Sequence, residues 1–154
     1  ILQVLGAPVR KELGRYAFKQ AVETKSERGD GSIMMVLATD APLSDRNLKR
    51  LAARAIMGLS RTGSSASNGS GDYVIAFSTN PKVRRALSAT RLSLEELGNE
   101  EMSGLFEGVV EATEEAIYNS LFQATTITGS GHTVEAIPLD KVREVLKKYR
   151  ASDR

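Results

Sequence analysis

The chain has 154 residues, of which 41% are hydrophobic and 26% charged, with a formal net charge of +2. This length and composition predict one ordinary domain, and a charge so close to zero does not favour nucleic-acid or membrane-surface binding. There is no cysteine and only one histidine, His132, which excludes disulfide scaffolds, thiol nucleophiles and metal sites with cysteine or two histidine ligands. We therefore expect no metal and no cofactor. No apolar run approaches the roughly 20 residues of a membrane span, and no targeting signal is visible, so we expect a cytoplasmic protein.

The first residues form an apolar, β-favouring run, Ile1–Leu5, that enters a Gly-Ala-Pro turn and predicts a short strand. Because the chain starts in the middle of such a run and without methionine, we expect it to belong to a longer gene product. Residues 10–27 are highly charged, with loosely spaced apolar positions. They are compatible with an irregular helix or with an extended surface segment.

Two strands and a connecting helix are predicted next. Residues 33–39 form a continuous apolar run bounded by turn residues, which indicates a strand buried on both faces. Apolar residues then recur every three or four positions from Leu48 to Leu59, as in an amphipathic helix. A small, polar loop at 62–72 leads into a second predicted buried strand at 73–79.

The C-terminal half adds a long helix over 101–122, a strand over 132–137 and a terminal helix that begins near Pro138. Buried strands that alternate with one-faced helices indicate a layered α/β fold.

Hydroxyl chemistry is what remains for a catalytic role. Ser32 follows Gly31 at the start of a predicted strand, so it is either an ordinary strand-start residue or a nucleophile at a sheet edge. A hydroxyl needs a base, and the usual imidazole could come only from His132, which we interpret as a structural or surface residue. Cleavage of the peptide bond before Ser32 would create an α-amine with a pKa near 7.7–8.0 that can act as the base. Glycine at position 31 permits the close geometry of such a self-attack.

The polar loop is the second candidate site. Ser70 and Asp72 alternate along the chain and point to the same side if the strand has begun, so the carboxylate could orient the hydroxyl. Backbone N–H groups around Asn68, Gly69 and Gly71 could stabilise an oxyanion. The alternatives are a plain flexible connection, or a loop over residues 63–71 that binds a small anion.

Several motifs in sequence order resemble the DmpA family of self-processing serine aminopeptidases, which includes L-aminopeptidase/D-esterases and β-peptidyl aminopeptidases. The similarity covers nearly the whole chain. The motifs are Gly6-Ala7-Pro8-Val9, Gly29-Asp30-Gly31-Ser32-Ile33, Ala38-Thr39-Asp40-Ala41-Pro42-Leu43, Arg61-Thr62-Gly63-Ser64, Asn68-Gly69-Ser70-Gly71-Asp72, Ala76-Phe77-Ser78-Thr79, Glu114-Glu115-Ala116, Asn119-Ser120-Leu121 and Gly131-His132-Thr133-Val134-Glu135.

The resemblance implies a four-layer α-β-β-α sandwich similar to that of N-terminal-nucleophile hydrolases, of which this chain supplies part. It implies self-cleavage between Gly31 and Ser32, so that residues 1–31 are the tail of an α chain and 32–154 a β chain led by the nucleophile. The supporting serine and acid of the family map onto Ser70 and Asp72, although the family acid is glutamate and this one is a methylene shorter.

The function implied is hydrolysis of peptides, amides or esters with a free amino end, through an acyl-enzyme on Ser32. Expected partners are the remainder of the α chain upstream of Ile1 and further copies of the αβ unit in a homo-oligomer. Two alternatives stay open: an anion-binding module that uses the 63–71 loop without chemistry, and an acyltransferase or pantetheine-amide hydrolase of the same fold.

Overall fold

The computed structural model describes residues 1–14 and 31–149. The described residues form two compact units, which are treated separately below. The βαβ unit comprises 31–58 and 66–113, and the terminal unit comprises 1–14, 59–65 and 114–149.

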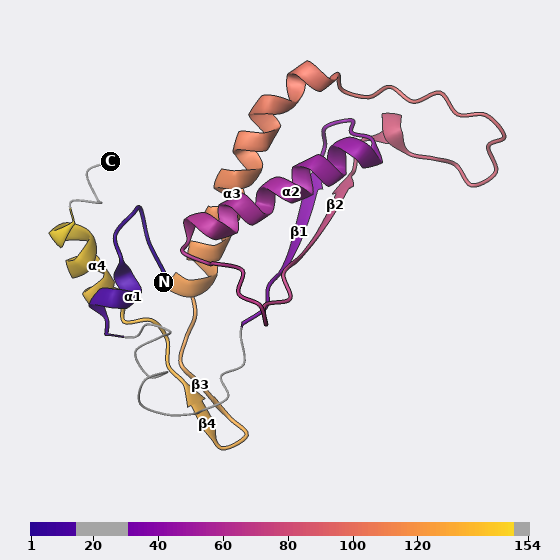
Figure 1. Cartoon of the computed structure of the whole chain (residues 1–154). Coiled ribbons are helices and arrows are strands. Elements are labelled where there is room, and N and C mark those ends of the chain that lie inside the picture. The colour runs from indigo at the N-terminus through magenta and orange to yellow at the C-terminus, as the bar shows by residue number, and fades with distance from the viewer. Residues whose placement is uncertain (15–30, 150–154) are drawn as a thin grey trace. The chain divides into compact units, whose positions relative to one another are not determined.

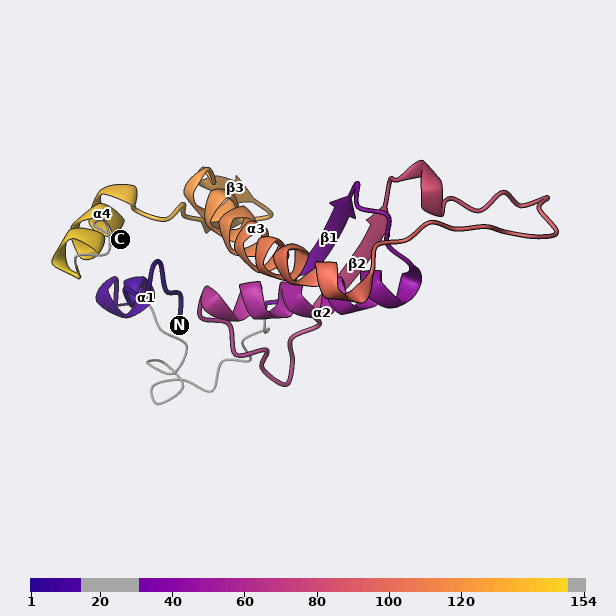
Figure 2. The same ribbon diagram turned by 90° about the horizontal axis from the view of Figure 1, so that it is seen from above.

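The βαβ unit is built on a parallel pair of strands, β1 (Met34–Thr39) and β2 (Tyr73–Ser78). Helix α2 (Asp45–Arg61) leads from the first strand towards the second, as parallel strands require a crossover connection. In both views it lies along one face of the sheet (Figures 1 and 2). The predictions of these strands and of the intervening helix are therefore confirmed.

The expectation that both strands are buried on both faces is wrong. In β1 only Met35 is buried, and residues of the opposite face are exposed in alternation along both strands. An apolar run satisfies a doubly covered strand, but in this unit helix α2 covers one face only. The exposed apolar face consists of Met34, Val36, Tyr73, Ile75 and Phe77, which are between 43% and 65% exposed.

Helix α3 (Met102–Phe122) confirms the long helix predicted for 101–122. In the βαβ unit it packs closely on α2 at Gly58, where a Cβ atom would lie 2.6 Å from the Val110 carbonyl oxygen. The Arg54 guanidinium also lies 3.6 Å from the centroid of the Phe106 ring. Before α3, the chain passes through two short 3-10 helices, η1 (Pro81–Val83) and η2 (Asn99–Glu101), and runs between them as a long irregular loop (Figure 1).

The terminal unit joins segments from both ends of the chain. Helix α1 (Val9–Glu12) contacts helix α4 (Leu139–Lys148), the predicted terminal helix. Both Lys148 and Tyr149 donate hydrogen bonds of 2.7 Å to the Glu12 carboxylate, and these bonds lower the pKa of that carboxyl. The buried core contains Val4, Ala7, Val9, Val142 and Val145.

The predicted strand at Ile1–Leu5 is not formed. Leu5 and Gly6 both have positive φ, of 50° and 81°, and reverse the chain so that Val4 forms an isolated bridge with Ala7. Such a turn ends an extended segment after very few residues. Most of the charged segment at 10–27 lies outside the described residues.

The terminal unit contains a two-stranded antiparallel sheet, of which the sequence predicted only one strand. Strand β4 (His132–Val134) confirms the expected strand, but it ends before Ile137 and pairs with an unpredicted strand, β3 (Ile127–Gly129). The two residues between them, Ser130 and Gly131, have φ of 51° and 77°. Positive φ at both central positions is typical of a two-residue hairpin turn, and the Ser-Gly pair was the available sequence signal.

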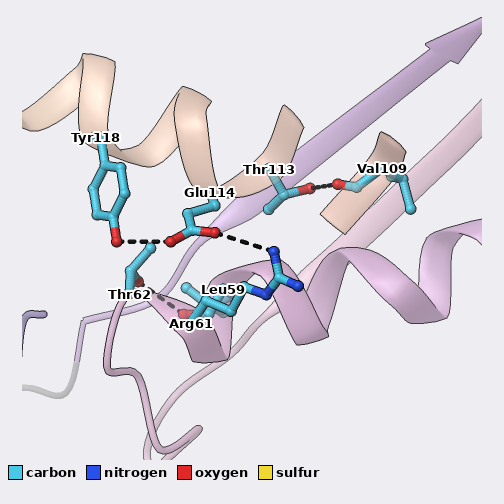
Figure 3. A network of polar contacts seen from close by, with 7 residues as sticks. All are labelled: Leu59, Arg61, Thr62, Val109, Thr113, Glu114 and Tyr118. Carbon is cyan, nitrogen blue, oxygen red and sulfur yellow. Dashed lines mark hydrogen bonds and ion pairs between the residues drawn. The ribbon is translucent and has the colours of Figure 1, made fainter. Parts of the chain in front are cut away.

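A polar chain links the end of α2 to the second half of α3 within the terminal unit (Figure 3). The Tyr118 hydroxyl donates to Glu114 at 2.9 Å, and Arg61 pairs with the other oxygen of Glu114 at 3.4 Å. Burial and the adjacent Glu114 raise the pKa of Tyr118 to about 12. No helix in the described part of the chain is long and apolar enough to cross a membrane.

Candidate active site

The candidate site lies within the βαβ unit, just before the amino ends of its two strands. The parallel register pairs Met34 with Tyr73, and the Tyr73 N–H donates to the Ile33 carbonyl at 3.0 Å. Continuing that alignment two residues back places Ser32 beside Gly71. The register thus brings together two segments that are far apart in sequence.

The hydroxyl of Ser32 is held by the backbone of the neighbouring segment. Its Oγ accepts a hydrogen bond of 3.0 Å from the Gly71 N–H. A donor in this position stabilises negative charge on the oxygen, which is what a serine needs in order to react as a nucleophile. The residue is exposed, so a reactant has access to it.

Ser70 connects the carbonyl of Gly31 to the carboxylate of Asp72. Its Oγ lies 2.8 Å from the Gly31 oxygen and 2.8 Å from Oδ1 of Asp72. A serine hydroxyl carries one proton and cannot donate fully to two acceptors at once. Ser70 is therefore placed to exchange its hydrogen bond between the carbonyl and the carboxylate.

The carboxylate of Asp72 reaches its partner in spite of its short side chain, as the 2.8 Å contact with Ser70 shows. Its second oxygen, Oδ2, is buried and has no hydrogen-bond partner among the described residues. A buried carboxylate oxygen without a donor is costly, and such groups often mark a functional site.

The loop residues proposed as oxyanion donors differ in their placement. Asn68 and Gly69 are exposed and occupy the centre of a turn closed by a 2.9 Å bond from the Ser70 N–H to the Ser67 carbonyl. Only Gly71 among the three contacts the candidate nucleophile. Because the N–H groups of Ser70 and Gly71 both have partners within the site, the loop does not offer them to a bound anion.

Two other sequence expectations concern residues outside this cluster. His132 begins β4 in the terminal unit and is exposed. Among residues 1–14 and 31–149, no group of three or more histidine, cysteine, aspartate or glutamate residues could hold a metal ion.

Sequence reasoning named Gly71 as a backbone donor but missed which groups the backbone of this site contacts. The Gly31 carbonyl as the acceptor for Ser70, and the Gly71 N–H as the donor to Ser32, depend on the strand register and not on residue type. Alternation along the second strand could have indicated that Gly71 and Tyr73 point to the same side.

The unit has an α/β arrangement, and an accessible serine with a hydrogen-bonded hydroxyl lies just before its first strand. These features indicate the class of α/β proteins that use a serine nucleophile. Comparison with protein-family models matches residues 1–134 to Peptidase family S58. The chain belongs to this family, which confirms the resemblance found in the sequence.

Curated and solved relatives agree with this assignment. The chain is 43% identical over 161 residues to the beta-peptidyl aminopeptidase BapA of Sphingosinicella microcystinivorans, covering 97% of this chain and 40% of that protein. It resembles the structure of an L-aminopeptidase D-Ala-esterase/amidase from Ochrobactrum anthropi with a TM-score of 0.81 and 34% identity, over 97% of this chain and 40% of the other. The PH0078 protein from Pyrococcus horikoshii OT3 matches with a TM-score of 0.79 and 39% identity, over 96% of this chain and 38% of the other.

The Ochrobactrum structure is described as a new variant of the Ntn hydrolase fold and as a prototype of the serine aminopeptidases. This likeness confirms the predicted fold class. The chain spans about two fifths of the length of these relatives, between 38% and 40%.

Proposed function

We propose that this chain carries the nucleophile of a self-processing serine aminopeptidase, with Ser32 as the nucleophile and the Gly31–Ser32 bond as the processing site. Two hydrogen bonds to the groups on either side of the Gly31–Ser32 peptide bond carry the proposal. Gly71 N–H donates to the Ser32 hydroxyl oxygen at 3.0 Å, while Ser70 Oγ lies 2.8 Å from the Gly31 carbonyl oxygen. The hydrogen bond from Gly71 holds the attacking oxygen of Ser32, and the hydrogen bond from Ser70 polarises the Gly31 carbonyl that this oxygen attacks.

Self-cleavage proceeds by transfer of the acyl group from nitrogen to oxygen. Ser32 Oγ bonds to the Gly31 carbonyl carbon, the C–N bond breaks, and the hydroxyl proton ends on the departing α-amine of Ser32. Water then hydrolyses the resulting ester, which leaves a carboxylate on Gly31 and restores the Ser32 hydroxyl. The α-amine freed at Ser32 serves as the base in later turnovers.

Ser70 and Asp72 support both reactions. As negative charge develops on the attacked carbonyl oxygen, the hydrogen bond from Ser70 strengthens, because bonds to charged acceptors are stronger than neutral ones. The Asp72 carboxylate, 2.8 Å from Ser70 Oγ, orients that hydroxyl. The unpartnered Oδ2 of Asp72 is an acceptor suited to an amine donor such as the one that cleavage creates.

The substrates proposed are peptides, amides or esters with a free amino end, which form an acyl-enzyme on Ser32 that water resolves. This agrees with the names of the relatives, a beta-peptidyl aminopeptidase and an L-aminopeptidase D-Ala-esterase/amidase. The anion-binding module gains no support, since the loop N–H groups of Ser70 and Gly71 are used within the site. The acyltransferase or pantetheine-amide hydrolase alternative would use the same nucleophile and differs in the acyl acceptor or the amide cleaved.

We propose the remainder of the α chain as the partner of this chain, within a homo-oligomer of αβ units. Two observations support the remainder of the α chain as a partner. The chain spans 40% of the BapA relative, and the part of the exposed sheet face away from Ser32 consists of Val36, Ile75 and Phe77. A contiguous apolar surface of this kind is typical of an interface. We keep the cytoplasmic location expected from the sequence as part of this proposal.

Mass analysis under denaturing conditions tests the proposal directly. The full-length protein is expected to yield a fragment that begins at Ser32, and Ser32→Ala is expected to abolish both the cleavage and the hydrolysis of amino-terminal amides. Ser93→Ala, in an exposed loop residue, is the matched control and retains both activities. Cleavage or hydrolysis that survives in Ser32→Ala would falsify the assignment of the nucleophile.

A further inference from the structure

The exposed apolar face of the sheet begins at the candidate nucleophile. Side chains alternate along a strand, so Gly71 and Tyr73 point to the same side of the sheet. A Cβ atom built on Gly71 would lie 3.4 Å from Ser32 Oγ, which places the hydroxyl on this side as well. The apolar face therefore starts beside the reacting oxygen.

Gly71 leaves a space between the hydroxyl and an aromatic ring. The same Cβ position lies 3.4 Å from Cε2 of Tyr73, so Ser32 Oγ and the Tyr73 ring flank one point in space. Both distances are ordinary van der Waals contacts, which means that an atom the size of a methyl group fits there without displacing either neighbour. A substrate bonded to Ser32 would have the Tyr73 ring beside it.

The residues around this space are apolar and accessible. Tyr73 is 65% exposed, and its register partner Met34 is 59% exposed. An aromatic ring offers a large, stiff apolar surface at low cost in side-chain entropy. Such an apolar surface beside a nucleophile favours substrates with an apolar side chain over substrates with a polar side chain or with none.

We propose that Tyr73 determines specificity by forming an apolar wall against the side chain of the amino-terminal residue that acylates Ser32. The inference rests on the proposed function and extends it by naming the substrate class, residues with apolar side chains. The part of the side chain next to this space is the ring carbon Cε2, so the phenolic hydroxyl is not required.

The test compares two p-nitroanilide substrates with a free amino end, one with an isobutyl side chain and one with hydrogen at the same carbon. The amino-acyl backbone, α or β, is the one that the parent enzyme hydrolyses. In the full-length protein, Tyr73→Ala is expected to lower the isobutyl-to-hydrogen ratio of kcat/KM by about tenfold, as loss of an apolar wall does. Tyr73→Phe is expected to keep the parental ratio.

Ile75→Ala is the matched control, because Ile75 lies on the same face one side chain further from Ser32. It is expected to leave the ratio unchanged. The inference is overturned if Tyr73→Ala leaves the ratio unchanged, or if Ile75→Ala lowers it equally. Should Tyr73→Ala fail to produce the fragment that begins at Ser32, Tyr73→Leu, with a smaller apolar side chain, replaces it, and an unchanged ratio there is equally adverse.

The parent protein separates this inference from the function on which it depends. If the parent neither cuts at Gly31–Ser32 nor hydrolyses either substrate, the proposed function is wrong. If the parent does both and the ratio does not respond to Tyr73, only the specificity role is wrong.

Discussion

Replacement of Ser70 by alanine is the sharpest perturbation of the proposed self-cleavage. Its hydroxyl is the side-chain donor 2.8 Å from the carbonyl oxygen of Gly31, where negative charge must develop when Ser32 attacks. The nucleophile and its own hydrogen bond from Gly71 remain in place in the variant. Ser70→Ala therefore removes stabilisation of the transition state without removing the attacking group.

The expected magnitude follows from the two contacts that are lost. Removal of one donor to a developing oxyanion costs about 2.7–4 kcal/mol, equivalent to a slowing of about 100- to 1,000-fold. Asp72 also loses the partner of Oδ1, and its Oδ2 is already unpaired. The carboxylate lacks this partner equally in the uncut state and in the transition state, so its loss does not change the barrier, and we expect a slowing of about 100- to 1,000-fold.

The assay follows the fraction of cut chain against time by denaturing mass analysis of freshly purified full-length protein. Ser67→Ala is the control, because only the backbone carbonyl of Ser67 takes part in the turn that leads to Ser70. The control should cut at the parental rate. If Ser70→Ala cuts within about threefold of the parent, less than 1 kcal/mol in activation free energy, the reasoning about the carbonyl donor fails.

Three further predictions concern stability, measured by urea denaturation of the full-length protein. Gly58→Ala would place a Cβ atom 2.6 Å from a carbonyl oxygen of α3, and we expect a loss of about 1–3 kcal/mol; an unchanged midpoint would contradict the close helix packing. Gly63→Ala combines a φ of 95° with a Cβ position 1.7 Å from a backbone oxygen and should destabilise at least as much, whereas Gly98→Ala, which meets open space, should not. Because the pKa of Tyr118 is raised to about 12, its contribution is complete below pH 10 and lost as the pH rises through about 12; Tyr118→Phe, which also breaks the bond to Glu114, should lack this part of the pH dependence, and an identical dependence would refute it.

The elements with strong periodicity could be predicted from the sequence. The apolar run at 33–39 and the repeat between Leu48 and Leu59 correspond to β1 and α2, because chain length, turn residues and side-chain spacing all agree there. The start of the chain could not be predicted in this way. Its strand propensity is overridden by the positive φ of Leu5, an unusual conformation for a residue with a large side chain.

Exposure of the sheet face was unpredictable for a different reason. Met34, Tyr73 and Ile75 are as apolar as residues of a doubly covered strand, and composition does not say which surface supplies the cover. The contacts of the candidate site could also be predicted only in part. Ser70 and Asp72 could be paired by alternation, but their approach to Gly31 and Ser32 depends on a register between strands about 40 residues apart, which no local pattern contains.

The core of the terminal unit draws on both sides of the Gly31–Ser32 bond. Val4 and Val9 come from the piece before it, whereas Val142 and Val145 come from the piece after it. If the bond is cut as we propose, this core joins two separate polypeptides, and its folding changes from a unimolecular to a bimolecular equilibrium. The stability of the processed protein then depends on its concentration, and dilution becomes a means of unfolding it that the uncut chain does not share.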